Sequence, residues 1–277
     1  MNILMISRVL YPRSATETAM FCAAEAFRKL GHHVAWFSME DKHNLPLEDV
    51  YVLIPKSRGR LARGFNRLVP SVYDKEAGEC MQERLQADCP DLALVWSIPD
   101  TMTWSVVETL HNWAVPTWVM LMDYLPVCPG RRLLVDDRPC RACFEGDFRP
   151  AMRHHCAGDM TAYAVREQRA LREQGLYGLP TGFFAPSEYH AKMFDEAQFT
   201  VKPVRNSELP LDPGAFEEVP TARGDFILYV GALTESKGIT ALMQSLAKCA
   251  THVPLVVAGD SPDRGALIKK ATAMELS

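Results

Sequence analysis

Short apolar runs alternate with helical patterns from the first residues of the chain, and this alternation constrains the fold more than any other feature. The runs are four to eight residues long and apolar on both faces, and they cover 2–7, 34–38, 50–55, 92–97 and 116–122. Strands of that kind are buried in parallel sheets. Helical patterns at 16–30, 73–87 and 101–111 predict strand–helix–strand units with helices on both faces of one sheet.

A second series of the same kind begins beyond residue 206. The segment 206–214 has the composition of a linker, and predicted strands follow at 226–233 and 255–258 with predicted helices at 237–250 and 263–276. Two strands and two helices fall short of an independent nucleotide-binding half, which needs about 100–150 residues. We therefore expect two Rossmann-like α/β domains with parallel sheets, 1–205 and 206–277, and expect the second to be incomplete.

Composition excludes several classes of protein. Hydrophobic residues make up 48% of the 277 residues and the net charge is −4, values typical of a globular chain rather than a disordered one. The pI of about 6.1 argues against a nucleic-acid partner. The apolar runs are too short to span a bilayer, and eight cysteines without a signal peptide favour a reducing cytoplasm.

Two strand ends carry the strongest chemical signal. Gly231 ends the strand of YVGALTESKG, Gly259-Asp260 end the strand of VVAGDSP, and a helix follows each of them. A glycine lets a ligand approach the backbone, and the start of a helix offers free N–H groups to an anion. Lys237 adds a positive charge at such a start, so the pattern suits a phosphate or diphosphate. Tight strand–helix packing with a solvated lysine explains the same pattern without a ligand.

Ordered motifs along the whole chain resemble family-four retaining glycosyltransferases of the GT-B fold. The run VGALTESKG followed by LVVAGDSPD resembles the opening of that family's C-terminal domain. Further matches are the first strand 2–7, the loop 12–17, LGHHV at 30–34, FAPSEY at 184–189 and the Arg205-Asn206 crossover.

The resemblance implies transfer of a sugar from a nucleotide-sugar donor, with retention of configuration, onto a glycan or lipid-linked acceptor. No cofactor is required, since a lysine neutralises the diphosphate, and Lys237 falls on that position. Gly231, Gly259 and Asp260 complete the expected donor site. Asp123, in a Met-Asp-Tyr version of the family's His-Asp-Tyr signature, is the expected catalytic residue. The expected acceptor-side loop comprises Arg13, Ser14, Ala15, Thr16 and Glu17.

Departures from the family pattern support a second reading. Ala232 stands where the family has an arginine, Ser14-Ala15 replace paired glycines, and Met122 replaces the histidine. The family's paired glutamates have no counterpart in this sequence. Ser14 and Glu17 also form an S-x-x-E capping box for the next helix. The alternative is a non-catalytic, truncated or degenerate homologue that acts as a binding subunit; a GT-B epimerase fits the architecture but not the motifs.

An irregular, cysteine-containing segment covers 123–156. It holds Cys128, Cys140, Cys143 and Cys156, with one C-x-x-C pair. Four thiolates can surround a structural zinc that folds a loop without an apolar core. Free or redox-active thiols and a disulfide are the other two readings.

The segment 56–68 combines five cations with apolar residues at helical spacing. This pattern is typical of a helix that lies on an anionic membrane, so we expect peripheral contact with the inner membrane face. A solvated helix with an apolar inner face is the alternative.

Overall fold

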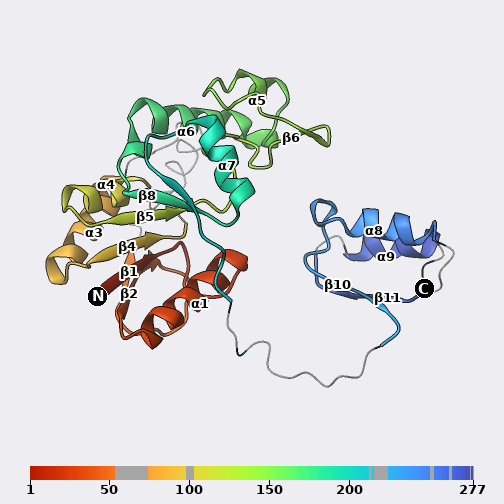
Figure 1. Ribbon diagram of the computed structural model, residues 1–277, viewed down its shortest axis with the longest axis horizontal. Coiled ribbons are helices and arrows are strands. Elements are labelled where there is room, and N and C mark those ends of the chain that lie inside the picture. The colour runs from red at the N-terminus through yellow and green to blue at the C-terminus, as the bar shows by residue number, and fades with distance from the viewer. Residues whose placement is uncertain are drawn as a thin grey trace. The chain divides into compact units, whose positions relative to one another are not determined.

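The computed structural model describes residues 1–53, 74–97, 103–211, 214, 224–249, 253–261, 264–274 and 276. The chain divides into two units, Met1–Ala215 and Phe216–Ser277, and each is described by itself (Figure 1). The predicted membrane segment 56–68 lies outside the described residues. In the part of the chain that is described, no helix is both long enough and apolar enough to cross a membrane.

The first unit is built on one seven-stranded sheet with the order β3-β2-β1-β4-β5-β8-β9 (Figure 1). Each neighbouring pair is parallel. The strands are β1 (Asn2–Ile6), β2 (His33–Met39), β3 (Val50–Leu53), β4 (Leu92–Val95), β5 (Thr117–Met120), β8 (Gly182–Ala185) and β9 (Val204–Asn206). The sequence had placed Arg205-Asn206 in a crossover, whereas both residues belong to the edge strand β9.

Helices cover both faces of this sheet, as the strand pattern predicts. They are α1 (Ala15–Lys29), α3 (Lys75–Ala87), α4 (Ser105–Asn112), α6 (Thr161–Glu173) and α7 (Glu188–Ala197). Side chains alternate along β1, so that Ile3 and Met5 pack in a core with α1, while Leu4 and Ile6 pack in a core with α3, α4 and α7. Burial on both faces explains why the strands are apolar throughout.

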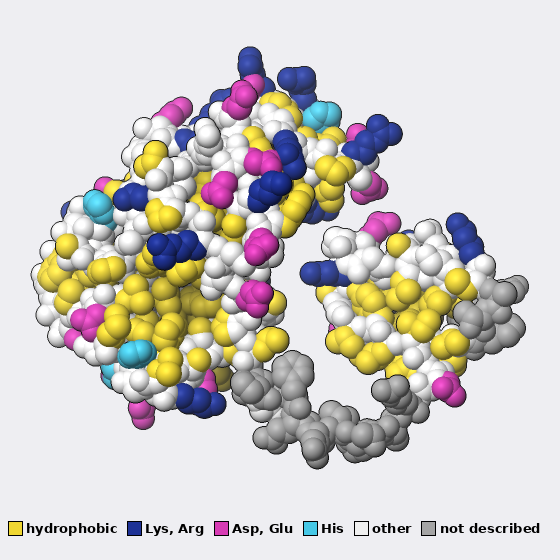
Figure 2. Space-filling model, in the orientation of Figure 1, with side chains coloured by type: hydrophobic (Ala, Val, Ile, Leu, Met, Phe, Trp, Pro, Cys, Tyr) yellow, Lys and Arg dark blue, Asp and Glu magenta, His cyan; other side chains and the backbone are white. Residues whose placement is uncertain are grey.

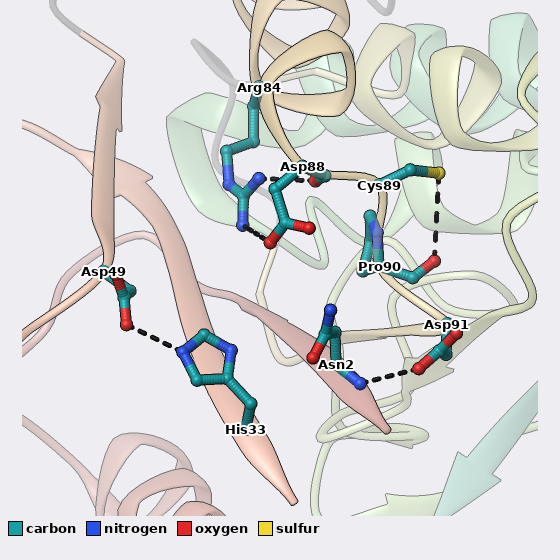
Figure 3. Close-up of polar contacts among 8 residues, drawn as sticks. All are labelled: Asn2, His33, Asp49, Arg84, Asp88, Cys89, Pro90 and Asp91. Atoms are coloured by element: carbon teal, nitrogen blue, oxygen red, sulfur yellow. Dashed lines mark hydrogen bonds and ion pairs between the residues drawn. The ribbon is translucent and has the colours of Figure 1, made fainter.

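Polar contacts tie the sheet together at the N-terminal ends of its strands (Figure 3). The backbone N–H of Asn2 donates to Asp91 at 2.7 Å, and His33 Nε2 lies 2.8 Å from a carboxylate oxygen of Asp49 (Figure 3). These contacts join residues at the starts of β1, β2, β3 and β4. In open α/β sheets, ligands bind at the carboxyl ends of the strands. We therefore expect a site at that end of this sheet, opposite these contacts.

The segment 123–156 has short elements and a small core of its own. It contains β6 (Leu134–Val135), β7 (Arg138–Pro139) and α5 (Arg149–Arg153), and β6 and β7 pair antiparallel. Phe148 is fully buried and packs with Cys143 and Ala151, and with Val165 of α6. The expectation of a loop without an apolar core was therefore wrong, because Phe148 supplies one.

The second unit pairs β10 (Ile227–Val230) with β11 (Leu255–Ala258) in parallel. Its helices are η4 (Glu235–Lys237), α8 (Ile239–Leu246) and α9 (Arg264–Ala273). Only Leu233, Ile239 and Met243 are buried hydrophobics among its described residues. Figure 2 shows hydrophobic side chains at its surface, and the exposed ones include Leu228, Val230 and Val256. The second unit therefore has a small hydrophobic core.

Candidate functional site

A pocket of about 190 Å³ opens at the carboxyl ends of β4 and β5 in the first unit. Its lining combines apolar side chains such as Met122 with aromatic and polar ones, namely Trp96, Ser97, Trp104, Asp123, Arg131, Glu167, Gln168 and Tyr177. The neighbouring strand β1 is tied to this edge, because the backbone N–H of Arg8 donates to the hydroxyl of Ser97 at 2.9 Å. Ligands of open α/β folds bind at this edge of the sheet. We call this hollow the strand-end pocket.

Asp123, the expected catalytic residue, lines the strand-end pocket with both carboxylate oxygens engaged. Oδ1 accepts a hydrogen bond from the backbone N–H of Leu125 at 2.8 Å, and Oδ2 forms an ion pair with Arg131 at 2.7 Å. The carboxylate thus holds the start of the 123–156 segment in place. Sequence reasoning missed Arg131, which lies in an irregular stretch where no pattern marks a pairing residue.

A buried imidazole lies beside the Asp123-Tyr124 turn. The ring of His190, on α7, lies 4.2 Å from the ring of Tyr124 and 5.1 Å from that of Phe194, between ring centroids. Burial lowers the pKa of His190 and raises the pKa of Tyr124. His190 therefore favours its neutral form beside the Asp123-Tyr124 turn.

The predicted acceptor-side loop begins helix α1. Ser14 is its N-cap, accepting from the N–H of Thr16 at 3.2 Å, and its hydroxyl donates to the buried carboxylate of Glu17 at 2.5 Å. The predicted N-cap role of Ser14 is confirmed, while Glu17 pairs with the hydroxyl of Ser14 rather than with its backbone N–H. Arg13, Ser14 and Ala15 are exposed. Their proposed contact with an acceptor stays a prediction.

In the second unit, the structure brings the two predicted strand-end glycines together. The N–H of Gly231 donates to the carbonyl of Ala258 at 3.0 Å, and Gly231 has a φ of 153°. A Cβ at Gly259 would lie 1.9 Å from the carbonyl oxygen of Gly231. No side chain fits at residue 259 without moving the backbone, and Gly259 itself is exposed.

Lys237 lies at the end of the loop that follows Gly231. The phenol of Tyr229 donates to the carbonyls of Ala232 at 2.9 Å and of Lys237 at 3.4 Å, which fixes both ends of the loop on β10. Gly238 follows with a φ of 79° and caps α8, and the side chain of Lys237 is exposed. An exposed ammonium group beside a helix start suits an anionic ligand.

Asp260 has a local backbone role next to these glycines. Its Oδ1 accepts from the N–H of Ser261 at 2.8 Å, and its carbonyl accepts from Leu233 at 3.4 Å. The second contact links the loop after β10 to the loop after β11. Gly231, Gly259, Asp260 and Lys237 thus belong to one loop pair, which we call the glycine-lysine loops.

All four cysteines of the 123–156 segment line one small cavity of about 20 Å³, together with His154. Burial raises the pKa of Cys143 to about 11, and that of Cys156 is raised too, with neighbouring thiols adding to both shifts. Across the described ranges, however, no three His, Cys, Asp or Glu side chains are grouped so that they could hold a metal ion. Zinc binding would require the thiols to move, and it stays a prediction.

Several solved structures resemble the whole chain. HepE from Anabaena in complex with UDP-glucose matches with a TM-score of 0.56 and 15% identity, over 100% of this chain and 67% of HepE. The lipopolysaccharide outer core galactosyltransferase WaaB in its apo form matches with a TM-score of 0.57 and 11% identity, over 100% and 66%. An alpha-glucosyltransferase in complex with UDP and a 13-mer DNA containing an HMU base matches with a TM-score of 0.52 and 14% identity, over 98% and 60%.

These likenesses define the class of fold. The neighbours are GT-B glycosyltransferases with Rossmann-like domains, and this chain has the same α/β architecture. The predicted fold class is confirmed. The chain spans 60% to 67% of the length of these three neighbours. No family model matches the sequence, and no curated protein matches it either.

Proposed function

We propose that this chain is a glycosyltransferase that takes a sugar from a nucleotide-sugar donor and transfers it, with retention of configuration, to a glycan or lipid-linked acceptor. The observation that carries the proposal is the meeting of the two strand-end glycines, where Gly259 is exposed, in one loop pair with the exposed Lys237 and the start of α8. A diphosphate matches that loop pair in charge and in hydrogen bonding. Neighbours of the same fold are in complex with UDP-glucose and UDP.

In this proposal the glycine-lysine loops stabilise the leaving group, which is the nucleoside diphosphate. When the bond between sugar and diphosphate breaks, negative charge builds on the diphosphate oxygens. Lys237 and the N–H groups at the start of α8 supply positive charge there without a metal. The backbone of this loop is held by Tyr229 and Gly238, so the exposed side chain of Lys237 is the part that has to be ordered on the diphosphate.

The acceptor belongs, in this proposal, to the first unit. The strand-end pocket offers aromatic surface with a few polar groups, the usual lining of a small-molecule site. Transfer to a nucleic acid is not expected, although one neighbour is in complex with DNA. The retaining outcome and the family-four assignment rest on the sequence motifs alone.

A cytoplasmic location is part of the proposal. All eight cysteines are free, which suits a reducing compartment. Contact of 56–68 with the inner membrane face is proposed from its cations and apolar spacing. Sedimentation with anionic and with neutral vesicles tests that contact. The chain is expected to sediment with the anionic vesicles and not with the neutral ones.

A second candidate function is that of a binding subunit without transferase activity. Ala232 supplies no cation, and its exposed position is where the family has an arginine. Val230 on β10 is 72% exposed and Leu228 is 55% exposed, so a partner chain could cover this strand.

Product release separates the two functions. The purified chain is incubated with a panel of UDP- and GDP-sugars and an acceptor mixture of oligosaccharides, lipid-linked sugars and DNA, and nucleoside diphosphate is measured. Acceptor-dependent release supports the transferase, and NMR of the anomeric proton of the product tests retention. Binding of a nucleotide sugar without release by the chain alone supports the subunit.

A further inference from the structure

One buried amide in the strand-end pocket lacks a hydrogen-bond partner. Gln168 lies in the middle of α6, lines the pocket and is 0% exposed. Its Oε1 accepts from the hydroxyl of Tyr177 at 2.5 Å, and no partner is found for its Nε2 within the part of the chain that the structure describes. An unpaired buried amide costs about 1–3 kcal/mol, so a ligand that pairs with it gains affinity.

The unpaired position does not depend on the orientation of the amide. A tyrosine hydroxyl can donate or accept, so turning the amide over would leave Oε1 unpaired in place of Nε2. In the first orientation a donor is left unpaired, and in the second an acceptor is left unpaired. A hydroxyl group satisfies either one.

Tyr177 holds this amide rigidly. Its ring is buried and packs edge-on against Trp104, with ring centroids 5.2 Å apart. Burial raises the pKa of Tyr177 far above its usual range, so the hydroxyl stays protonated. The side chain of Gln168 is therefore fixed before any ligand arrives, and little side-chain entropy is lost on binding.

The charges around the pocket disfavour an anionic ligand. Asp123 and Glu167 are carboxylates, and the guanidinium of Arg131 is already paired with Asp123. A phosphate or carboxylate would be repelled by these two carboxylates, and Arg131 is already paired with one of them. The aromatic surface of Trp104 favours a ligand with an apolar face.

Size sets the last limit on the ligand. A volume of about 190 Å³ is smaller than the roughly 300–1,000 Å³ of sites for drug-sized molecules. The pocket therefore accommodates one small ring rather than an extended chain.

We infer that the strand-end pocket binds a single neutral pyranose ring, with a ring hydroxyl hydrogen-bonded to the amide of Gln168 and an apolar face on Trp104. This inference rests on the proposed function, because such a ring is one sugar of the acceptor. Gln168 is then a specificity residue. A site built to pair with a hydroxyl discriminates strongly against an analogue that lacks it.

Ligand-observed NMR on the full chain tests this inference without any donor. The probes are the methyl glycosides of glucose, galactose, mannose and N-acetylglucosamine, with glucose 6-phosphate as an anionic comparison. At least one methyl glycoside is expected to bind, and at least one of its deoxy derivatives is expected to bind about tenfold more weakly. Glucose 6-phosphate is expected to bind more weakly than the corresponding neutral ring.

Three variants locate the binding. Gln168→Leu is expected to weaken the glycoside about tenfold, and Gln168→Leu/Tyr177→Phe to do the same with no unpaired group left. Gln174→Leu, an exposed glutamine that ends the same helix, is the matched control and keeps full affinity. The double variant is expected to melt at or above the wild-type temperature, because it buries no unpaired polar atom.

The inference fails if no methyl glycoside binds the wild type, or if the folded Gln168 variants bind as tightly as the wild type does. Nucleotide-sugar binding is measured on the same samples, since the donor residues belong to the other unit. Glycoside binding without donor binding contradicts the proposed function and leaves this inference standing. Donor turnover without glycoside binding contradicts this inference and leaves the proposed function standing.

Discussion

The carbonyl oxygen of Gly231 occupies the place that a side chain at residue 259 would need. A Cβ on Gly259 would lie 1.9 Å from that oxygen, far inside any real contact. Because β10 and β11 are parallel neighbours, their ends meet at this point. The requirement for glycine at residue 259 therefore comes from the main chain itself.

Gly259→Ala is expected to destabilise the second unit. The added methyl must displace β10 or β11, at a cost of about 1–3 kcal/mol, in a unit with a small hydrophobic core. Hydrogen exchange of the amides at 227–230 and 255–258 measures the effect, and exchange is expected to speed up. Gly265→Ala is the matched control, because its Cβ would meet open space within α9. That helix is expected to gain about 0.5–1 kcal/mol. Equal exchange rates in the two variants would contradict the account.

Lys237→Ala is expected to weaken binding of UDP about tenfold at low ionic strength. The loss corresponds to one hydrogen bond to a charged group, about 1.5 kcal/mol or more. Calorimetric titration at low and high salt measures it, and the difference between variant and wild type should shrink as salt screens the charge. Lys248→Ala, which removes an exposed lysine beyond α8, is the control and should bind as the wild type does. If Lys237→Ala binds UDP as tightly as the wild type does, Lys237 is not part of the UDP site.

The first unit is expected to lose stability as the pH falls below about 6.5. Burial between Tyr124 and Phe194 lowers the pKa of His190 in the folded state, whereas the unfolded chain keeps the ordinary value of about 6.5. Below that pH the unfolded state binds the extra proton, so the free energy of unfolding falls by up to about 1.4 kcal/mol per pH unit.

Melting of His190→Gln between pH 5 and pH 8 tests this dependence. The variant should show a flatter pH profile than the wild type. His154→Gln, at an exposed histidine, should keep the wild-type profile. A His190→Gln profile as steep as that of the wild type would show that another group carries the effect.

Cys143 is expected to resist alkylation at neutral pH. Its pKa of about 11 leaves about one thiol in a thousand ionised at pH 8, and only the thiolate reacts. Pulsed iodoacetamide labelling followed by mass spectrometry should show Cys143 reacting far more slowly than the exposed Cys89 and Cys249. Its rate should rise about tenfold per pH unit below pH 11. Equal labelling of the three thiols at pH 8 would contradict the burial.

Metal analysis and thiol titration in denaturant separate the three readings of the cysteine segment. Because all eight cysteines are free, eight titratable thiols are expected without reduction. Six thiols would instead indicate a disulfide. One zinc per chain, lost in Cys140→Ser, would support the structural zinc. A zinc-free chain with eight thiols would contradict it.

The main elements could be predicted because their signals are local. The runs that are apolar on both faces predicted β1, β2 and β4 closely, and the S-x-x-E pattern predicted the start of α1 at Ser14. The helix expected at 237–250 is shorter, spanning Ile239–Leu246, because Gly238 adopts a left-handed conformation between η4 and α8. The sequence does not show whether a glycine within a helical pattern continues the helix or ends it.

The polar pairs of the strand-end pocket could not be predicted, since each depends on tertiary contacts. Gln168 belongs to a polar helical pattern, in which a glutamine is normally placed on the solvated face. Its burial follows from its place in the lining of the strand-end pocket and from its contact with Tyr177. The pairing of Arg131 with Asp123 likewise depends on a turn within the 123–156 segment. By contrast, Gly231 and Gly259 were found because a strand that ends in glycine is visible in sequence.

Hydrogen exchange with a nucleotide-sugar panel tests the central claim most directly. Each UDP- or GDP-sugar is added to the full chain, and exchange is followed by peptide. One donor is expected to slow exchange at residues 231–238 and 259–261 in the wild type and in Lys248→Ala, with the protection lost in Lys237→Ala. If no donor slows exchange in these residues, or if Lys237→Ala is protected as well as the wild type, the glycine-lysine loops are not a nucleotide-sugar site.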